Sequence, residues 1–324
     1  MSETTVATEL THLSTSMRAV VFHSPGGPEV LSVIDVPVPE PAEGQVRIEV
    51  LAAPVFSADV AARSGAFGSM LPPRPYYTLG WDMAGTVDKL GSGVVNFAVG
   101  DSVIGMSSPM HAPAGTQAEY LVLNASELAL SPTGLSLVAA STIPANGLTA
   151  VQALDALGLA GGDTLAILGA AGAVGGYAAE LAHQRGIRVL GVGSTGDAGF
   201  ITRVGAEFVP RSDDVVEAIR RRVPQGVDGL LDAAGVGSAA MGAVRDGGVF
   251  AALLPPATPA PERDIRVVRV MLHSDGPQLR ELASLAERGR LTTRVARTYG
   301  FDEAAQAHAA FAMGGMRGRL ILVP

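Results

Sequence analysis

Two patterns of hydrophobic and polar positions divide the chain. Up to about residue 136, short segments alternate apolar and polar side chains between turn residues, as they do over residues 45–52. A period of two is typical of strands that bury one face, and short strands at this spacing predict an all-β, barrel-like domain. The predicted strands cover residues 18–22, 30–36, 45–52, 85–87, 100–105 and 118–123. A short helix is expected over Ser57–Arg63, with Ser57 as its N-cap.

After residue 136 the pattern changes to short apolar runs that alternate with helical segments. The apolar runs predict strands at residues 164–168, 188–192, 207–209, 227–231, 249–254 and 265–271. The predicted helices cover residues 137–145, 148–157, 173–185, 197–204 and 213–222. Strands that alternate with helices predict a doubly wound parallel sheet, and six strands is the number found in dinucleotide-binding domains.

The last segment is expected to pack back on the first domain. It holds predicted helices at residues 277–288 and 302–313 and predicted strands at 293–298 and 319–323, which is too little to fold alone. The expected organisation is therefore a mobile N-terminal extension over residues 1–16, a β-rich domain that begins at 17–136, a cofactor-binding domain at 137–275 and a return to the first domain at 276–324.

A glycine turn follows the first strand of the predicted parallel sheet. Gly169, Gly172 and Gly175 recur at intervals of three between the apolar run 164–168 and a helical segment. A dinucleotide needs a tight turn, a close backbone approach to its pyrophosphate and free N–H groups at a helix N-terminus. We therefore predict that this turn binds the cofactor, through Gly169, Ala171, Gly172, Ala173, Val174 and Gly175.

The composition narrows the classes of function. Of 324 residues, 48% are hydrophobic and 17% are charged, and the net charge of −8 provides no overall basic field for nucleic acid. The apolar run at 165–179 is too short to span a bilayer, so no membrane segment is predicted. The chain has no cysteine, which excludes disulfides, thiolate catalysis and cysteine-ligated zinc. Residues 1–16 lack the pattern of a signal peptide, and the expected compartment is the cytoplasm.

Short motifs follow one another in a fixed order from Met17 to Pro324. They lie at residues 17–22, 27–31, 59–65, 79–85, 99–103, 115–120, 148–150, 226–232, 307–308 and 318–319. Together with the glycine turn, they resemble the medium-chain dehydrogenase/reductase superfamily, and within it the zinc-free quinone oxidoreductase (zeta-crystallin-like) branch. The resemblance implies a GroES-like catalytic domain interrupted by a Rossmann domain, with the active site between them. It also implies a homodimer, and hydride transfer from a reduced nicotinamide to a small molecule, either a quinone or an activated alkene.

The residues also disfavour a zinc site. Trp81 and Asp82 stand where the zinc enzymes of this superfamily have a His-Glu pair. Only fifteen residues separate Val103 from Glu119, and none of them is cysteine, so the lobe that holds structural zinc is missing. His111 lies alone in this stretch and is interpreted as a surface-loop histidine. No metal ligand is predicted.

The candidate catalytic residues are hydrogen-bond donors. Reduction of a conjugated carbonyl places negative charge on its oxygen, which a donor stabilises. Tyr76, Tyr77 and Thr149 are the candidates, although the tyrosines could be packing residues and Thr149 could bond its own helix. The family commonly has asparagine where this chain has Phe56, which cannot form side-chain hydrogen bonds and would narrow the pocket or make it more apolar. Ser57 is the candidate to supply the lost polar group.

The choice of cofactor depends on the end of the second predicted strand. Ser194 and Thr195 stand where a 2′-phosphate would accept hydrogen bonds, with Arg203 and Arg211 near in sequence. This favours NADPH. NADH stays open because Asp197 replaces the family's usual basic residue and could repel a phosphate, with capping of the next helix as the favoured interpretation. The remaining predicted cofactor contacts lie at strand ends or near the C-terminus: Ala234, Gly235, Val236, Phe250, Leu253 and Arg319. Arg317 is a further candidate, with surface solvation as the alternative.

The sequence therefore leads to one main hypothesis and two alternatives. The main hypothesis is a zinc-independent oxidoreductase that transfers hydride from NADPH to a quinone, enone or enal. The first alternative is an enoyl-thioester reductase of a biosynthetic pathway. The second, motivated by Phe56, is a nucleotide-binding or sensing protein with little catalysis.

Overall fold

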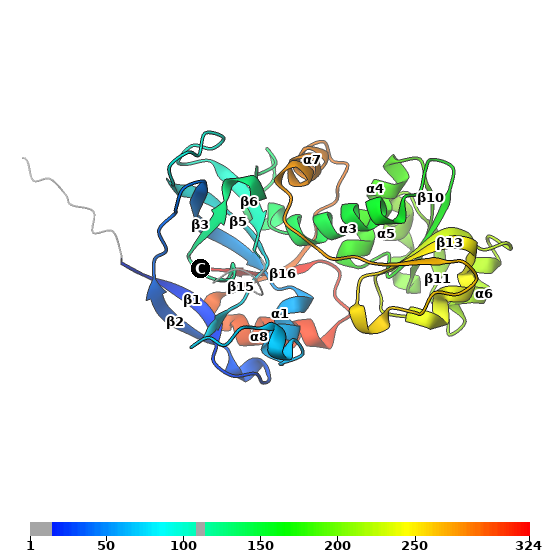
Figure 1. Cartoon of the computed structure of the whole chain (residues 1–324), viewed down its shortest axis with the longest axis horizontal. Helices are drawn as coiled ribbons and strands as arrows, with labels where there is room; N and C mark the ends of the chain where they lie inside the picture. The colour runs from blue at the N-terminus through cyan, green and yellow to red at the C-terminus, as the bar shows by residue number, and fades with distance from the viewer. Residues whose placement is uncertain (1–14, 108–113) are drawn as a thin grey trace, which may run out of the picture.

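Two bodies lie side by side in the computed structural model, which describes residues 15–107 and 114–324 (Figure 1). The first body contains the N-terminal strands and the C-terminus, and the second contains the parallel sheet. Residues 1–14 of the predicted extension and the loop histidine His111 lie outside the described residues. Residues 15 and 16 are described, and the first strand already begins at Ser16.

The first body is a strongly bent, mainly antiparallel array of short strands. A three-stranded sheet has the order β2-β1-β4, and a larger sheet has the order β15-β16-β3-β5-β6-β8, with β7 also paired to β3. Alternate apolar side chains of β3, including Val46, Ile48 and Val50, fill the core between these strands. The strands from the N-terminal part are β1 (Ser16–Phe22), β2 (Ser32–Pro37), β3 (Gln45–Pro54), β4 (Tyr77–Thr78), β5 (Asp82–Leu90), β6 (Ser102–Met106), β7 (Tyr120–Asn124) and β8 (Leu128–Leu130).

Helix α1 (Ser57–Arg63) has the predicted bounds, but its N-cap is Phe56 and not Ser57. The carboxylate of Asp59, at the third helical position, accepts the backbone N–H of Phe56 at 2.8 Å. Because the side chain of Asp59 bonds the backbone of Phe56, the N-cap position falls one residue before Ser57, which corrects the predicted cap.

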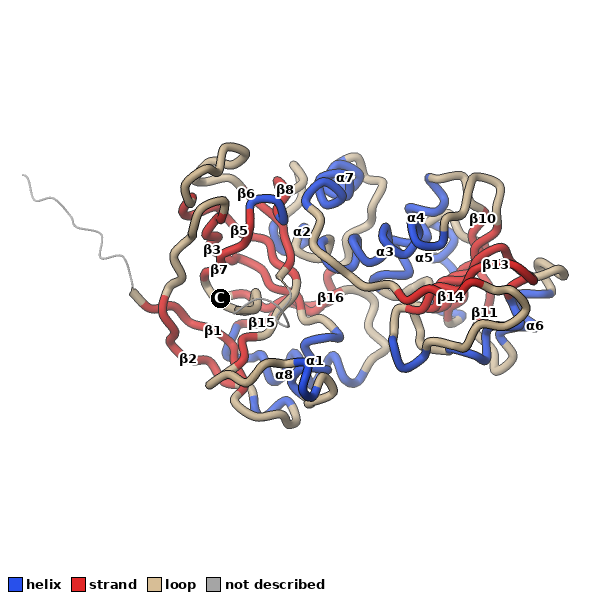
Figure 2. Tube along the Cα trace, in the orientation of Figure 1, coloured by secondary structure: helices blue, strands red, loops and turns tan. Residues whose placement is uncertain are grey.

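The second body is the doubly wound parallel sheet that the sequence predicts. Its strand order is β11-β10-β9-β12-β13-β14, with every neighbouring pair parallel. The strands are β9 (Thr164–Leu168), β10 (Arg188–Gly193), β11 (Glu207–Pro210), β12 (Val227–Asp232), β13 (Val244–Ala252) and β14 (Arg266–Arg269). Helices α3 (Pro144–Leu157), α4 (Ala173–Gln184), α5 (Ala198–Arg203) and α6 (Val215–Arg220) flank this sheet (Figure 2). The order reverses at β9, where such sheets bind ligands at their carboxyl edge.

Two predicted boundaries in this body differ by four or more residues. The predicted helix 137–145 is shorter in the structure, where α2 covers Leu137–Ala140. Helix α3 begins at Pro144, because proline, which lacks an N–H, is favoured in the first turn of a helix. Strand β13 begins at Val244, five residues earlier than predicted, since Gly247 and Gly248 interrupt its apolar pattern. Residues Leu137–Leu157 are long and apolar enough to cross a membrane by length and composition, but 83% of that window is buried inside the protein.

The C-terminal segment returns to the first body, where its last strands complete the larger sheet. Strand β16 (Arg319–Val323) pairs antiparallel with β3, with Ile321 opposite Pro54, and β15 (Val295–Gly300) pairs with β16. Helix α7 (Gly276–Glu287) packs against β8 and α3, and α8 (Ala304–Met313) packs against β16. The segment just before β16 reaches the parallel sheet, because Arg317 pairs with Asp197 after β10.

Candidate active site

A cleft of about 1170 Å³ lies between the two bodies. One wall is built from the carboxyl edge of the parallel sheet, including the glycine turn after β9 and the loops after β12 and β13. The opposite wall comes from α1, the short helix Gly68–Met70 and Trp81. A site of this volume is large enough for an extended cofactor together with a small substrate.

The glycine turn has a backbone that side chains would disrupt. Gly169 has a φ of +76°, the left-handed region that favours glycine. A Cβ on Gly175 would lie 2.2 Å from the carbonyl oxygen of Gly169, and one on Gly172 would lie 3.1 Å from the same oxygen. Gly172 is the N-cap of α4, so the first N–H groups of this helix open toward the cleft. This turn fits the pyrophosphate of a dinucleotide, which binds at a helix N-terminus.

The predicted cofactor residues of the turn fall into two groups. Gly169, Gly172, Ala173, Val174 and Gly175 line the cleft. Ala171 does not: it is buried, and its carbonyl accepts a hydrogen bond from Nη1 of Arg294 at 3.0 Å. Nη2 of Arg294 donates to the carbonyl of Gly172 at 2.8 Å. Arg294, which the sequence analysis did not single out, therefore braces the turn from the C-terminal segment.

The loop after β12 is held by one buried carboxylate. Oδ1 of Asp232 accepts the N–H groups of Ala234, Gly235 and Val236 at 3.1, 2.8 and 3.2 Å. Its Oδ2 accepts the N–H of Gly237 at 2.8 Å. These bonds fix the predicted residues Ala234, Gly235 and Val236 along the cleft wall.

The loop after β13 is only partly as predicted. Leu253 lines the cleft, whereas Phe250 is fully buried and packs in the core on the other side of the sheet, beside Leu190 and Leu230. Strand residues alternate between the two faces, and Phe250 points to the face that α6 covers. The prediction that Phe250 lines the nicotinamide side is therefore wrong.

The wall opposite the glycine turn is apolar. The rings of Phe56 and Trp81 lie with their centroids 5.9 Å apart, and both line the cleft. Ala58, Phe67 and Met70 extend the same surface. Ser57 also lines it, from the first turn of α1. This wall suits a flat, conjugated molecule that needs few hydrogen bonds.

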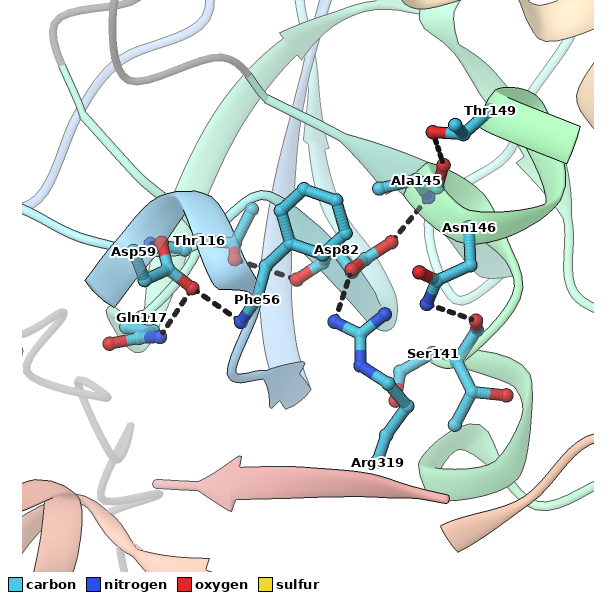
Figure 3. A network of polar contacts seen from close by, with 12 residues as sticks. Phe56, Asp59, Asp82, Thr116, Gln117, Ser141, Ala145, Asn146, Thr149 and Arg319 are labelled. Atoms are coloured by element: carbon cyan, nitrogen blue, oxygen red, sulfur yellow. Dashed lines mark hydrogen bonds and ion pairs between the residues drawn. The ribbon is translucent and has the colours of Figure 1, made fainter. Parts of the chain in front are cut away.

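Arg319 places a buried positive charge at the cleft. Its Nη2 donates to Oδ2 of Asp82 at 2.7 Å, and the other oxygen of Asp82 accepts the N–H of Ala145 (Figure 3). Its guanidinium lies 5.3 Å from the centroid of the Phe56 ring. Nε and Nη1 of Arg319 are buried and have no partner among the described residues. Buried charged donors without partners are costly, so this pair of donors points to a ligand.

Helix α3 brings two polar side chains to the cleft. Thr149 lines it, but its hydroxyl donates to the carbonyl of Ala145 at 2.6 Å, within its own helix (Figure 3). The hydroxyl hydrogen is thus already used, contrary to the predicted role as a donor to substrate. Asn146 also lines the cleft and was missed by the sequence analysis. Its signal was a single amide within an apolar helical start.

Tyr76 and Tyr77 lie outside the cleft, which corrects their predicted place as catalytic donors. The ring of Tyr77 stacks on Phe22 with centroids 5.0 Å apart, and its hydroxyl donates to the carbonyl of Pro72 at 3.1 Å. Tyr76 packs against the core of β1 and β2 and lies edge-on to His23. Pairing of β4 with β1 places Tyr77 opposite Phe22, and the two tyrosines pack in different apolar clusters of the first body.

The end of β10 carries a charged cluster that differs from the prediction. Ser194 and Thr195 follow β10, as expected, but neither is among the residues that line the cleft. Asp197 caps their turn by accepting the N–H and the hydroxyl of Ser194. Arg203 and Arg211 are exposed, and no side-chain partner is found for either within the described ranges. The guanidinium at Ser194 is that of Arg317, whose Nη2 lies 3.3 Å from the serine Oγ. The nearby charge thus comes from a residue more than one hundred positions away.

No group of three or more His, Asp or Glu side chains that could hold a metal ion is found in residues 15–107 and 114–324. Asp82, at the position compared with the zinc enzymes, is bonded to Arg319 and to the N–H of Ala145.

The chain is similar to several known oxidoreductases. Residues 42–133 match the alcohol dehydrogenase GroES-like domain family, and residues 204–322 match the zinc-binding dehydrogenase family. The NADPH-dependent alkenal/one oxidoreductase, chloroplastic, of Arabidopsis thaliana is 29% identical over 95% of this chain and 80% of its own length. The NAD-dependent alcohol dehydrogenase of Sulfurisphaera tokodaii is 30% identical over 67% of this chain and 71% of its own. The structure of the quinone oxidoreductase from Coxiella burnetii superposes with a TM-score of 0.85, at 28% identity, over 95% of this chain and 99% of that one.

Proposed function

The chain belongs to the medium-chain dehydrogenase/reductase superfamily, and we propose that it reduces a quinone or an activated alkene with hydride from NADPH. The observation that carries this proposal is the cleft, in which a dinucleotide-type glycine turn faces the apolar wall of Phe56 and Trp81. The names of the relatives support it, since one is an alkenal/one oxidoreductase and another a quinone oxidoreductase.

The residues of the cleft fit a nicotinamide dinucleotide. The glycine turn offers the N-terminal N–H groups of α4 to a pyrophosphate, and added side chains at Gly172 or Gly175 would crowd the carbonyl oxygen of Gly169 and distort this turn. Nε and Nη1 of Arg319 are further donors for an anionic group. When bound, the reduced nicotinamide supplies the hydride.

The apolar wall supports a conjugated substrate. Phe56, Trp81 and Met70 would contact a flat ring or alkene and exclude water from it. The hydroxyl of Ser57 and the amide of Asn146 line the same cleft and would donate to a carbonyl oxygen as negative charge develops on it. A quinone needs the least help of this kind, because its ring delocalises the charge.

We propose a zinc-independent reaction, although the family that matches residues 204–322 is described as zinc-binding. Zinc in this superfamily needs cysteine, histidine or a free carboxylate. The chain has no cysteine, Trp81 stands at the histidine position, and the carboxylate of Asp82 is occupied by Arg319 and Ala145.

A panel of acceptors and coenzymes tests the proposal. Purified protein is mixed with NADPH or NADH and a benzoquinone, an alkenal, a vinyl ketone or an enoyl thioester, and coenzyme oxidation is followed by absorbance. We expect turnover with quinones or with alkenals and enones, and none in the reverse assay with saturated alcohols and oxidised coenzyme. A clear preference for the enoyl thioester, alcohol oxidation, or coenzyme binding without any turnover would overturn the proposal.

A further inference from the structure

An ion pair joins the C-terminal segment to the end of β10. Nε of Arg317 lies 2.5 Å from Oδ1 of Asp197, and Nη2 lies 2.7 Å from Oδ2. Arg317 belongs to the loop between α8 and β16, whereas Asp197 ends the short helix Thr195–Asp197 that follows β10. The ion pair therefore joins the first body, which contains β16, to the second body, which contains the parallel sheet.

The donors of Arg317 are fully used within the protein. Nη1 donates to the carbonyls of Gly315 and Met316 at 3.2 and 3.1 Å, and Nη2 also reaches Oγ of Ser194 at 3.3 Å. The guanidinium nevertheless stays close to half exposed, at 44% of the side chain, so a ligand can approach it.

Asp197 is as firmly held as its partner. Its side chain is only 8% exposed, and its carboxylate accepts the N–H of Ser194 at 3.1 Å as well as the hydroxyl of Ser194. The guanidinium of Arg317 and then the Ser194 hydroxyl hold the pKa of Asp197 well below its usual range. The carboxylate is thus charged at neutral pH, and the pair has no net charge.

The position of this ion pair connects it with the choice between NADPH and NADH. In a sheet of this order, the adenosine ribose lies at the end of the second strand, which is β10 here. A 2′-phosphate in that place would bind a guanidinium through two parallel N–H···O hydrogen bonds and would accept a further bond from a nearby hydroxyl. Arg317 and Ser194 are those groups, and the Asp197 carboxylate already makes the two-point contact and the hydroxyl contact.

We propose that Arg317 binds the 2′-phosphate of NADPH and that the Asp197 carboxylate competes with this phosphate for the Arg317 guanidinium. The ion pair sets the coenzyme preference: the phosphate of NADPH must displace a carboxylate from Arg317, whereas NADH need not. The wild-type protein therefore discriminates only weakly between the two coenzymes. This inference rests on the proposed function, because it concerns the coenzyme of the same cleft.

Direct binding of NADPH and NADH tests the inference without any substrate. Dissociation constants are measured from coenzyme fluorescence for the wild type, Asp197→Asn, Arg317→Gln and the double variant. Asparagine at 197 can still accept the N–H of Ser194, and thermal unfolding checks that each variant is folded. We expect Asp197→Asn to tighten NADPH about tenfold, the effect of roughly one freed charge-assisted contact, and to leave NADH nearly unchanged.

The double variant and a matched arginine control complete the experiment. Arg317→Gln should remove the gain of Asp197→Asn, and on its own should weaken NADPH relative to NADH. Arg203→Gln changes an exposed arginine six positions beyond Asp197 and should leave both constants unchanged. An unchanged NADPH-to-NADH ratio in Asp197→Asn and Arg317→Gln, or a loss of NADPH binding in Arg203→Gln alone, would overturn the inference. Binding of neither coenzyme would overturn the proposed function with it.

Discussion

Asp82 and Arg319 form a buried ion pair, 2.7 Å between Oδ2 and Nη2, that joins the start of β5 to the start of β16. The same carboxylate accepts one N–H from the first turn of α3, that of Ala145. Three elements from distant parts of the chain therefore meet at one charge beside the cleft, and this pair holds the unpartnered donors of Arg319 in place.

Removal of one partner should cost more than removal of both. Arg319→Met leaves the Asp82 carboxylate buried without its counter-charge, and we expect the free energy of unfolding to fall by about 3–5 kcal/mol. The double variant Arg319→Met with Asp82→Asn removes the uncompensated charge and should regain part of this loss. Chemical denaturation measures both changes. A double variant no more stable than Arg319→Met would contradict the description of Asp82 as a charge neutralised by Arg319.

The glycine turn provides the second prediction. Valine at Gly172 places side-chain atoms between the turn and the cleft, where its Cβ alone would lie 3.1 Å from the carbonyl oxygen of Gly169. We expect Gly172→Val to lose coenzyme binding by at least about a hundredfold while the fold is retained. Gly161→Ala is the control, because its added Cβ would meet only ordinary contacts in the turn before β9. Equal coenzyme affinity in Gly172→Val and wild type would show that the turn does not hold the pyrophosphate.

The apolar wall provides the third prediction. Phe56→Ala removes a ring that contacts Trp81 and covers the Arg319 guanidinium, so kcat/KM for quinones should fall about tenfold or more. The affinity for coenzyme should change little, because Phe56 lies on the wall opposite the glycine turn. Tyr77→Phe is the matched control outside the cleft and should keep the wild-type rate. The reverse result, with Tyr77→Phe inactive and Phe56→Ala unaffected, would place the substrate elsewhere.

A buried carboxylate gives the protein a pH-dependent term in its stability. Burial raises the pKa of Asp59 to about 7, against hydrogen bonds from the N–H groups of Phe56 and Gly80 that lower it. The folded state therefore holds this proton more tightly than the unfolded state does. The stability from Asp59 is complete in acid, below the ordinary carboxyl pKa, and is lost as the pH rises through about 7.

Unfolding free energies measured across this pH range test the sign. The wild type should lose stability between acid and pH 8 relative to Asp59→Asn, whose side chain cannot titrate. Asp59→Asn is expected to be less stable overall, since its amide cannot accept both N–H groups, so the slope with pH is the informative quantity. Parallel curves for the two proteins would show that folding does not raise the pKa of Asp59.

Local patterns in the sequence were sufficient for the parallel sheet and its glycine turn. Strands and helices that alternate have one common arrangement, and Gly169 to Gly175 mark its ligand-binding edge. The direction of individual side chains was harder to predict. Residues 249–254 are apolar without alternation, so nothing in the sequence indicated that Phe250 faces the core while Leu253 faces the cleft.

The charged residues of the site depend on contacts between distant segments. Arg317 reaches Asp197 across 120 positions, and Arg319 reaches Asp82 across 237. Sequence proximity instead suggested Arg203 and Arg211, which are exposed. The position of Tyr76 and Tyr77 before the Gly80 turn predicts a place near the cleft, but Tyr77 pairs with Phe22 of β1 and Tyr76 packs against the core of β1 and β2. Such pairings follow from the folded domains and have no local signal.

Hydride transfer within this cleft is tested most directly by a single turnover. NADPH is incubated with excess wild-type protein or with the same excess of Gly172→Val, each sample is mixed rapidly with a quinone or an enone, and oxidation of the coenzyme is followed by stopped-flow absorbance. We predict rapid oxidation of the bound coenzyme by the wild type and a rate near the uncatalysed one with Gly172→Val. Bound NADPH that stays reduced with every acceptor, or equal rates for the two proteins, would contradict the proposed function.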